Sequence, residues 1–131
     1  MEEKKVSLKL QGEGTFLAEL SYGTLLTGLN GFNPMELLLT SLGACTGVDV
    51  YVILKKKRQE VEDLKIEVRG KRREEHPRAF EEIELRYLVK GKVSEKAVEQ
   101  AVRLSTEKYC SVLASLNPSI KLRVSWEVWS G

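Results

Sequence analysis

The pattern of apolar and polar positions begins with strict alternation. Within residues 4–10, Val6, Leu8 and Leu10 alternate with Lys5, Ser7 and Lys9, which predicts a half-buried β-strand that Gly12 and Gly14 end. Residues 15–21 and 25–29 lie on either side of a Tyr-Gly-Thr turn and predict two more strands. The N-terminal part of the chain is therefore expected to contain three strands.

A long helix is expected next, because its start and end signals are clear. Asn33 is a good N-cap, Pro34 suits the first helical position, and Glu36 falls where a capping box places its acid. The cations at residues 55–58 suit the negative end of the helix dipole, which gives a helix of roughly 25 residues. Residues 37–54 are apolar on nearly all sides, as in a helix buried all round. A chain of this length can hardly surround such a helix, whereas a dimer can.

The second half of the chain predicts a β-hairpin, a second helix and a final strand. Their residues are 64–68 and 83–89 for the hairpin, 97–105 for a helix capped by Ser94, and 121–129 for the strand. The order is three strands, a long buried central helix, a hairpin, a helix and a last strand. We therefore expect one α+β domain that covers residues 1–131.

The composition is that of an ordinary globular protein, with 131 residues, 42% hydrophobic and 31% charged, and a net charge of +2. Such a small charge implies no strong field for nucleic acid or membranes. The N-terminus carries no secretory signal, so a cytoplasmic location is expected. The most continuously apolar stretch, residues 37–48, is too short to span a bilayer, so no membrane segment is expected.

Residue counts exclude several kinds of site. One histidine and two cysteines far apart in sequence supply no zinc or haem ligand set, so no metal or cofactor is expected. His76 lies in a charged loop beside a proline, where a solvated histidine is expected rather than a catalytic base. Residues 28–31 are similar to the Gly-x-x-Gly loop of RNA-binding KH domains, but that loop joins two helices and this one follows a strand. We therefore expect no nucleic-acid partner.

Gly43 and Gly47 lie one turn apart within the long helix. Glycine in a helix interior costs about 1 kcal/mol relative to alanine, so a compensating contact is expected. One interpretation is the close approach of a second backbone, with the same helix of a partner subunit as a candidate. The other is the tolerance of small residues in a tight core.

The two cysteines, Cys45 in the long helix and Cys110 where the second helix ends, are the candidate chemistry. The residues alone leave three interpretations open: inert packing, a structural disulfide and a redox pair. A cytosolic location disfavours the structural disulfide, because thiols are kept reduced there. Asp49 lies on the same helical face as Cys45 and disfavours a Cys45 thiolate when it is ionised. An activating cation must therefore come from elsewhere.

Residues 33–39, 45–50 and 107–112 read NPMELLL, CTGVDV and EKYCSV. Together they resemble the OsmC/Ohr superfamily (osmotically inducible protein C and organic hydroperoxide resistance protein). The resemblance includes the order of strands and helices and the spacing of the two cysteines. It implies an OsmC-like fold and an intertwined homodimer, in which sheets from both chains wrap two central helices and two active sites lie at the subunit interface.

In that family the cysteine that matches Cys45 is peroxidatic and the one that matches Cys110 is resolving. The resemblance therefore implies a thiol-dependent peroxidase for organic hydroperoxides, in oxidative-stress defence. Cys45 would become a sulfenic acid and Cys110 would condense with it to a disulfide. A dithiol reductant, lipoyl groups in some members, would then restore both thiols without a metal or cofactor.

Two positions depart from the peroxidase pattern. Members of the Ohr type have a glutamate directly after the Asn-Pro pair, where this chain has Met35, and an arginine in an early loop, whereas the first arginine here is Arg58. The chain is thus most similar to an OsmC-like subgroup without that Arg–Glu pair. The alternative to an enzyme is an OsmC-like homodimer that binds a small apolar or thiol-reactive ligand at its interface.

Overall fold

The computed structural model describes residues 1–129, and the chain divides into two compact units. The first unit is Met1–Leu38 and the second begins at Leu39. The long helix α1 (Pro34–Lys56) begins in the first unit and continues into the second. The mixed α+β content confirms the predicted fold class.

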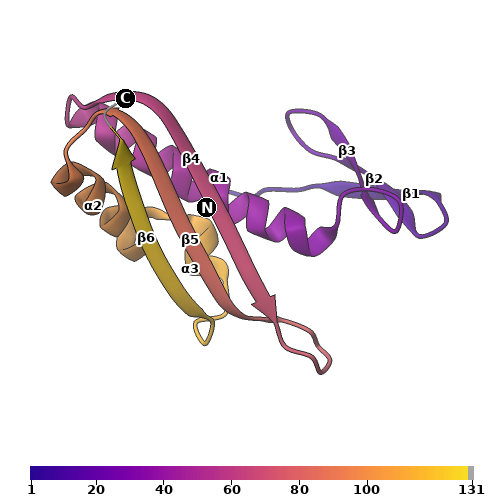
Figure 1. The fold of residues 1–131 in the computed structure, drawn as a ribbon. Coiled ribbons are helices and arrows are strands. Elements are labelled where there is room, and N and C mark those ends of the chain that lie inside the picture. Colours follow the sequence, from indigo (N-terminus) through magenta and orange to yellow (C-terminus); the bar gives the residue numbers. More distant parts are fainter. Residues whose placement is uncertain (130–131) are drawn as a thin grey trace. The chain divides into compact units, whose positions relative to one another are not determined.

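The first unit contains the three predicted strands as an antiparallel meander in the order β1-β2-β3 (Figure 1). The strands are β1 (Ser7–Gly12), β2 (Thr15–Glu19) and β3 (Thr24–Gly28). A bulge between Leu10 and Gly12 lets β1 continue to the glycine that was expected to end it. The prediction of a half-buried first strand does not hold in the single chain, because every residue of β1 is exposed.

The ends of α1 follow from local hydrogen bonds. The Asn33 side-chain oxygen accepts from the backbone N–H groups of Met35 and Glu36 at 2.9 and 3.1 Å, which confirms the predicted N-cap. After the last helical residue, Arg58 adopts a left-handed conformation with φ 59°, and its N–H donates to the Lys55 carbonyl. This arrangement stops the helix at Lys56, close to the predicted end.

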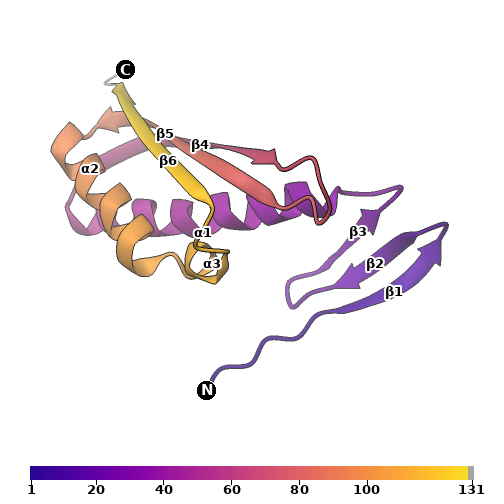
Figure 2. The same cartoon turned by 90° about the horizontal axis from the view of Figure 1, so that it is seen from below.

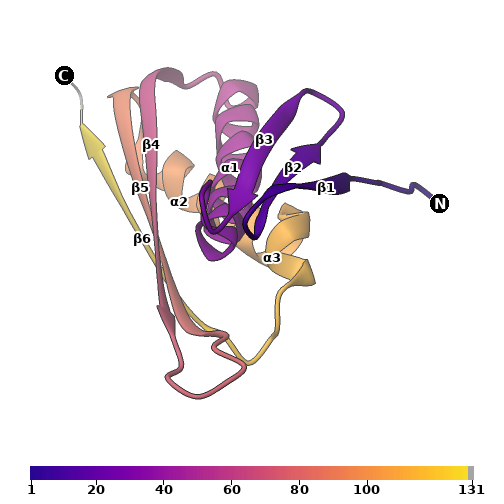
Figure 3. The ribbon, with the colours of Figure 1, turned by 90° about the vertical axis from the view of Figure 1, so that its right-hand side faces the viewer.

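The second unit is a three-stranded sheet with its helices on one face (Figures 2 and 3). The strands are β4 (Glu60–Arg72), β5 (Phe80–Lys92) and β6 (Lys121–Trp129). The pair β4–β5 is antiparallel and β5–β6 is parallel. Between β5 and β6 lie the helix α2 (Glu95–Leu104), the π-helical turn η1 (Ser105–Tyr109) and the short helix α3 (Ser111–Ser115). Neither η1 nor α3 was predicted.

The core of the second unit lies between the sheet and the helices. The residues predicted for the inner face of β5 and for the inner face of the second helix are all buried. They are Ile83, Leu85, Tyr87 and Val89 on β5, and Ala97, Val98, Ala101, Val102 and Ser105 on α2 and η1. The period-2 and period-3.6 patterns therefore located both buried faces.

The two glycines of α1 face the chain's own sheet. A Cβ atom on Gly43 would lie 2.9 Å from a methyl group of Val68, and one on Gly47 would lie 2.7 Å from the terminal methyl of Ile66. Both contacts are with side chains of β4. The interpretation that these glycines admit a second backbone, such as a partner's helix, is therefore wrong; they admit the side chains of a strand.

Helix α1 spans 23 residues and is long and apolar enough, by length and composition, to cross a membrane. The expectation of no membrane segment rested on the apolar run at residues 37–48, and the helix extends beyond that run on both sides. Core helices of globular proteins pass the same test. Leu42, Val50 and Leu54 are fully buried on one face of α1, whereas Val48 and Tyr51 on the other are 62% and 46% exposed.

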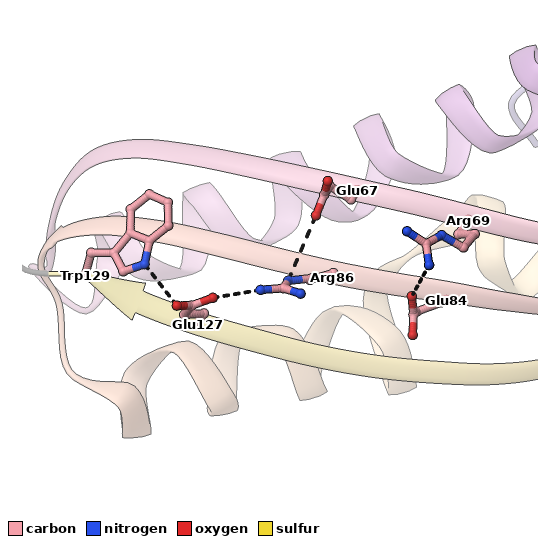
Figure 4. Close-up of polar contacts among 6 residues, drawn as sticks. All are labelled: Glu67, Arg69, Glu84, Arg86, Glu127 and Trp129. Carbon is pink, nitrogen blue, oxygen red and sulfur yellow. Dashed lines mark hydrogen bonds and ion pairs between the residues drawn. The ribbon is translucent and has the colours of Figure 1, made fainter.

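The outer face of the β4–β6 sheet carries opposite charges side by side (Figure 4). Arg86 lies between Glu67 and Glu127, at N–O distances of 3.9 and 2.8 Å. The indole N–H of Trp129 donates to Glu127, and this bond and the one from Arg86 lower the pKa of Glu127. Exposed pairs of this kind contribute little individually. This face is a solvated surface, as the alternation of charges predicts.

Candidate functional site

The structure brings the two cysteines together. Cys45 lies on α1, and Cys110 lies between η1 and α3. Their side chains lie close enough to interact, since Cys45 raises the pKa of the Cys110 thiol, and both are free thiols. Cys110 is buried, at 4% exposed, whereas Cys45 is half-buried.

The π-helical turn determines where Cys110 lies. The backbone N–H of Cys110 donates to the Ser105 carbonyl at 2.8 Å, five residues back. The carbonyl of Cys110 accepts from the N–H of Ala114 at 3.0 Å, so the residue also begins α3. Cys110 is thus held on both sides by backbone hydrogen bonds. Single π-turns occur frequently at functional sites.

Burial controls the acidity of Cys110. It raises the pKa of this thiol from 9.0 to about 11, while the backbone N–H of Leu113 acts in the opposite direction. The neighbouring Cys45 side chain and the charge of Asp49 raise the pKa further. At neutral pH Cys110 is therefore a thiol and not a thiolate.

A chain of buried hydroxyl groups lies beside the thiols and links three elements. The Thr46 hydroxyl on α1 is 2.7 Å from the Tyr87 hydroxyl on β5 and 2.7 Å from the Ser105 hydroxyl on η1. Ser105 in turn donates to a carboxylate oxygen of Asp49 at 2.8 Å. All three hydroxyl residues are fully buried. Burial raises the pKa of Tyr87 to about 12.

The direction of each bond follows from the number of protons. An ionised Asp49 can only accept, so Ser105 gives it its single proton. Thr46 must then donate to Ser105, and Tyr87 must donate to Thr46. Each hydroxyl donates once, and all the donors point from Tyr87 toward Asp49. Among the described residues no buried side-chain nitrogen or oxygen lacks a partner.

Asp49 also lines a cavity of about 520 Å³. The other lining residues are Val52, Ile53, Lys56, Lys57, Leu104 and Tyr109, from α1 and the segment that follows it and from the ends of α2 and η1. The walls are mostly apolar, with two cations and one carboxylate. The buried hydroxyl chain therefore ends at the wall of a cavity large enough for a small organic molecule.

The remaining sequence-based candidates lie elsewhere. His76 is exposed in the loop between β4 and β5, as predicted. The Gly-x-x-Gly segment at 28–31 begins with the last residue of β3 and joins no two helices, also as predicted. Among residues 1–129 no cluster of three or more His, Cys, Asp or Glu residues could hold a metal ion.

Sequence reasoning placed Thr46, Tyr87 and Ser105 in apolar segments or on buried faces but did not infer that they bond to one another. A signal was present, because a hydroxyl at a buried position must find a hydrogen-bond partner. The sequence contains three such residues, one directly after Cys45 and one five residues before Cys110. Which of these hydroxyls bond to one another depends on how α1, β5 and η1 pack in the folded protein.

The structure is an α+β unit with one thiol on its long helix and a second thiol after its second helix. The model of the family described as OsmC-like protein matches residues 27–125. The chain therefore belongs to the OsmC-like family.

Three known proteins are similar to this chain. Protein YhfA of Escherichia coli K12 is 42% identical over 120 residues, which cover 87% of this chain and 90% of YhfA. A hypothetical protein of Aquifex aeolicus VF5 has a crystal structure with 62% identity and a TM-score of 0.97, with each chain covered completely. The organic hydroperoxide resistance protein OsmC of Legionella pneumophila shares the fold, with a TM-score of 0.74 at 15% identity and 98% of each chain covered.

Proposed function

We propose that this protein is a thiol peroxidase for organic hydroperoxides, with Cys45 as the nucleophile and Cys110 as the resolving thiol. The observation that carries the proposal is the proximity of two free thiols from distant parts of the sequence, close enough for Cys45 to raise the pKa of Cys110. Membership of the OsmC-like family and the shared fold of a protein named for hydroperoxide resistance support it.

The reaction needs only thiol chemistry. The Cys45 thiolate attacks the terminal oxygen of R–O–O–H, the O–O bond breaks, and the alkoxide leaves and takes a proton from solvent to give the alcohol. Cys45 is then a sulfenic acid. The Cys110 sulfur attacks the Cys45 sulfur, a disulfide forms, and the hydroxyl leaves as water with the thiol proton. A dithiol reductant, with lipoyl groups as a candidate, reduces the disulfide by exchange.

Burial favours this assignment of roles. A peroxidatic cysteine must reach the substrate as a thiolate. Cys110 is almost completely buried and has a pKa raised to about 11, which suits a thiol that acts only after the other has been oxidised. Cys45 is the more exposed of the two. The resolving role therefore falls to Cys110.

The proposal includes a homodimer in which each chain is a single domain. The exposed apolar residues of α1, with Val48 at 62%, are surfaces that a monomer would normally cover. The sheet of the first unit likewise exposes Leu8, Leu10 and Phe16. Both surfaces would be buried in an intertwined dimer. A cytoplasmic location, without membrane or nucleic-acid partners, completes the proposal.

A ligand-binding protein without turnover is the second candidate. The cavity that Asp49 lines favours it, because a volume of about 520 Å³ and mostly apolar walls suit a small organic ligand. This function predicts saturable binding that persists in Cys45→Ser.

Turnover distinguishes the two candidates. We expect the reduced protein to consume cumene hydroperoxide continuously with dihydrolipoamide as the reductant, and Cys45→Ser to consume none above background. Ser111→Ala, which changes an exposed side chain next to Cys110, is the matched control and should retain turnover. Equal rates for the wild-type protein and Cys45→Ser would overturn the peroxidase proposal.

A further inference from the structure

Ser105 contacts both elements that carry the thiols. Its hydroxyl bonds to Thr46 and Asp49 of α1 at 2.7 and 2.8 Å. Its carbonyl accepts the N–H of Cys110 at 2.8 Å. Thr46 follows Cys45 directly, and Asp49 lies one helical turn after it. One residue thus connects the helical turn of Cys45 to the backbone of Cys110.

The local backbone makes this connection possible. In a regular α-helix the Ser105 carbonyl would accept from the N–H of Tyr109, four residues on. The π-helical turn moves that bond to Cys110, so that the residue held by Ser105 is the cysteine itself. Ser105 and Thr46 are both fully buried, so water does not compete for their hydroxyl bond.

We propose that Ser105 is a positioning residue that holds Cys110 against Cys45 for disulfide formation. For its place in a catalytic cycle the inference rests on the proposed function. In that cycle the Cys110 sulfur attacks the Cys45 sulfenic sulfur, the S–O bond breaks, and the hydroxyl and the thiol proton leave as water. Ser105 makes and breaks no covalent bond. Its hydroxyl bonds to α1 and its carbonyl bond to Cys110 hold the two sulfur atoms close to each other.

Variants of Asp49 can separate the effect of positioning Cys110 from the effect of a negative charge near its thiol. Its carboxylate anchors the Ser105 hydroxyl, while its charge raises the pKa of Cys110 and so opposes thiolate formation. Asp49→Asn keeps a hydrogen-bond acceptor and removes the charge, whereas Asp49→Ala removes both. If position dominates, Asp49→Asn forms the disulfide at least as fast as the wild-type protein and Asp49→Ala forms it more slowly.

The experiment uses diamide, a diazene oxidant that joins two adjacent thiols and is itself reduced to a hydrazine, so that no peroxide chemistry is required. Disulfide formation in the reduced full-length protein is followed by intact mass under non-reducing conditions. We expect Ser105→Ala and Asp49→Ala to slow it about tenfold or more, as misplacement of reacting groups does. Thr106→Val removes a hydroxyl that donates to the Val102 and Arg103 carbonyls of α2 and to neither thiol-bearing segment, and it should match the wild-type rate.

Each outcome decides the proposal. Slow closure in Ser105→Ala and Asp49→Ala with fast closure in Asp49→Asn supports it. A wild-type rate in Ser105→Ala or in Asp49→Ala overturns it, as does an Asp49→Asn variant as slow as Asp49→Ala. Asp49 is only half-buried, so substitutions there are expected to leave the protein folded. The Asp49 variants therefore test the proposal even if Ser105→Ala does not fold. If diamide gives this pattern and cumene hydroperoxide leaves the thiols reduced, the positioning role stands and the proposed function fails.

Discussion

Tyr87 and Cys110 show how burial and acidity are coupled in this protein. Both side chains are almost completely removed from water, and both carry their protons more tightly than they would in an unfolded chain. A buried thiolate or phenolate is costly because the interior solvates charge poorly. The site is therefore built around neutral groups, with Asp49 at its edge.

Stability should consequently fall at alkaline pH. The pKa is about 11 for Cys110 and about 12 for Tyr87, against 9.0 and 10.0 ordinarily. Raised values mean that the folded state holds more protons, so the stabilisation is complete below pH 9 and is lost as pH rises through 11 and 12. We expect urea-unfolding free energies to decline from pH 8 to 11, and Cys110→Ala to flatten the decline. Tyr22→Phe, at a fully exposed tyrosine, should leave the decline unchanged; a flat wild-type profile would contradict this account.

The directed hydroxyl chain predicts coupling between two of its members. Thr46→Val leaves the buried Tyr87 hydroxyl without its acceptor, which should cost about 1–3 kcal/mol of unfolding free energy. In a Tyr87→Phe background that hydroxyl is absent, so Thr46→Val should cost less. A double-mutant cycle by urea denaturation measures the difference. Additive effects would mean that the two hydroxyls do not depend on each other.

At the scale of elements, α1 has glycines where it packs against β4. Gly43 and Gly47 leave room for Val68 and Ile66 of β4, and larger residues there would separate helix and sheet. Close packing between a helix and a sheet tolerates little added volume.

The two glycines should respond differently to substitution. Gly43→Leu would drive a large side chain into the stiff, β-branched Val68 and should destabilise the fold by about 1–3 kcal/mol. Gly47→Ala meets only the flexible terminal methyl of Ile66. Because alanine also favours the helix by about 1 kcal/mol, we expect this variant to be close to neutral. Thermal unfolding followed by circular dichroism measures both. A Gly43→Leu variant as stable as the wild-type protein would show that α1 does not lie against β4 as described.

The elements could be predicted from the sequence to the extent that their signals are local. Asn33 and Pro34 set the start of α1, and alternation located the inner faces of β4 and β5. The turn η1 could not be predicted, because a π-turn differs from an α-turn by one hydrogen bond that only tertiary packing decides. The same holds for the site: the resemblance singled out Cys45 and Cys110, but the hydroxyl chain beside them arises from contacts among three elements.

For the whole molecule, the proposed dimer accounts for the apolar surfaces that a single chain leaves exposed. Val48 and Tyr51 on α1 belong to a helix that is apolar on nearly all sides. In the single chain only one face of that helix is covered. Burial of the other face supplies a hydrophobic driving force for association.

Charge on that face should therefore weaken association. We expect Val48→Arg to shift the sedimentation coefficient from that of a dimer toward that of a monomer, because an arginine buried at an interface without a partner is strongly unfavourable. Lys96→Glu, which alters an exposed charge on α2, is the control and should remain dimeric. A wild-type protein that sediments as a monomer would exclude the proposed dimer.

The central claim of this account is that the two neighbouring thiols form a redox pair that hydroperoxide oxidises, and intact mass tests it most directly. One equivalent of cumene hydroperoxide is added to the reduced protein under non-reducing conditions. We expect the mass to fall rapidly by two hydrogens in the wild-type protein. Cys110→Ser should instead retain a sulfenic acid on Cys45 that dimedone traps, and Cys45→Ser should not change. Thiols that stay reduced for hours in the wild-type protein would contradict the proposed peroxidase function and favour ligand binding.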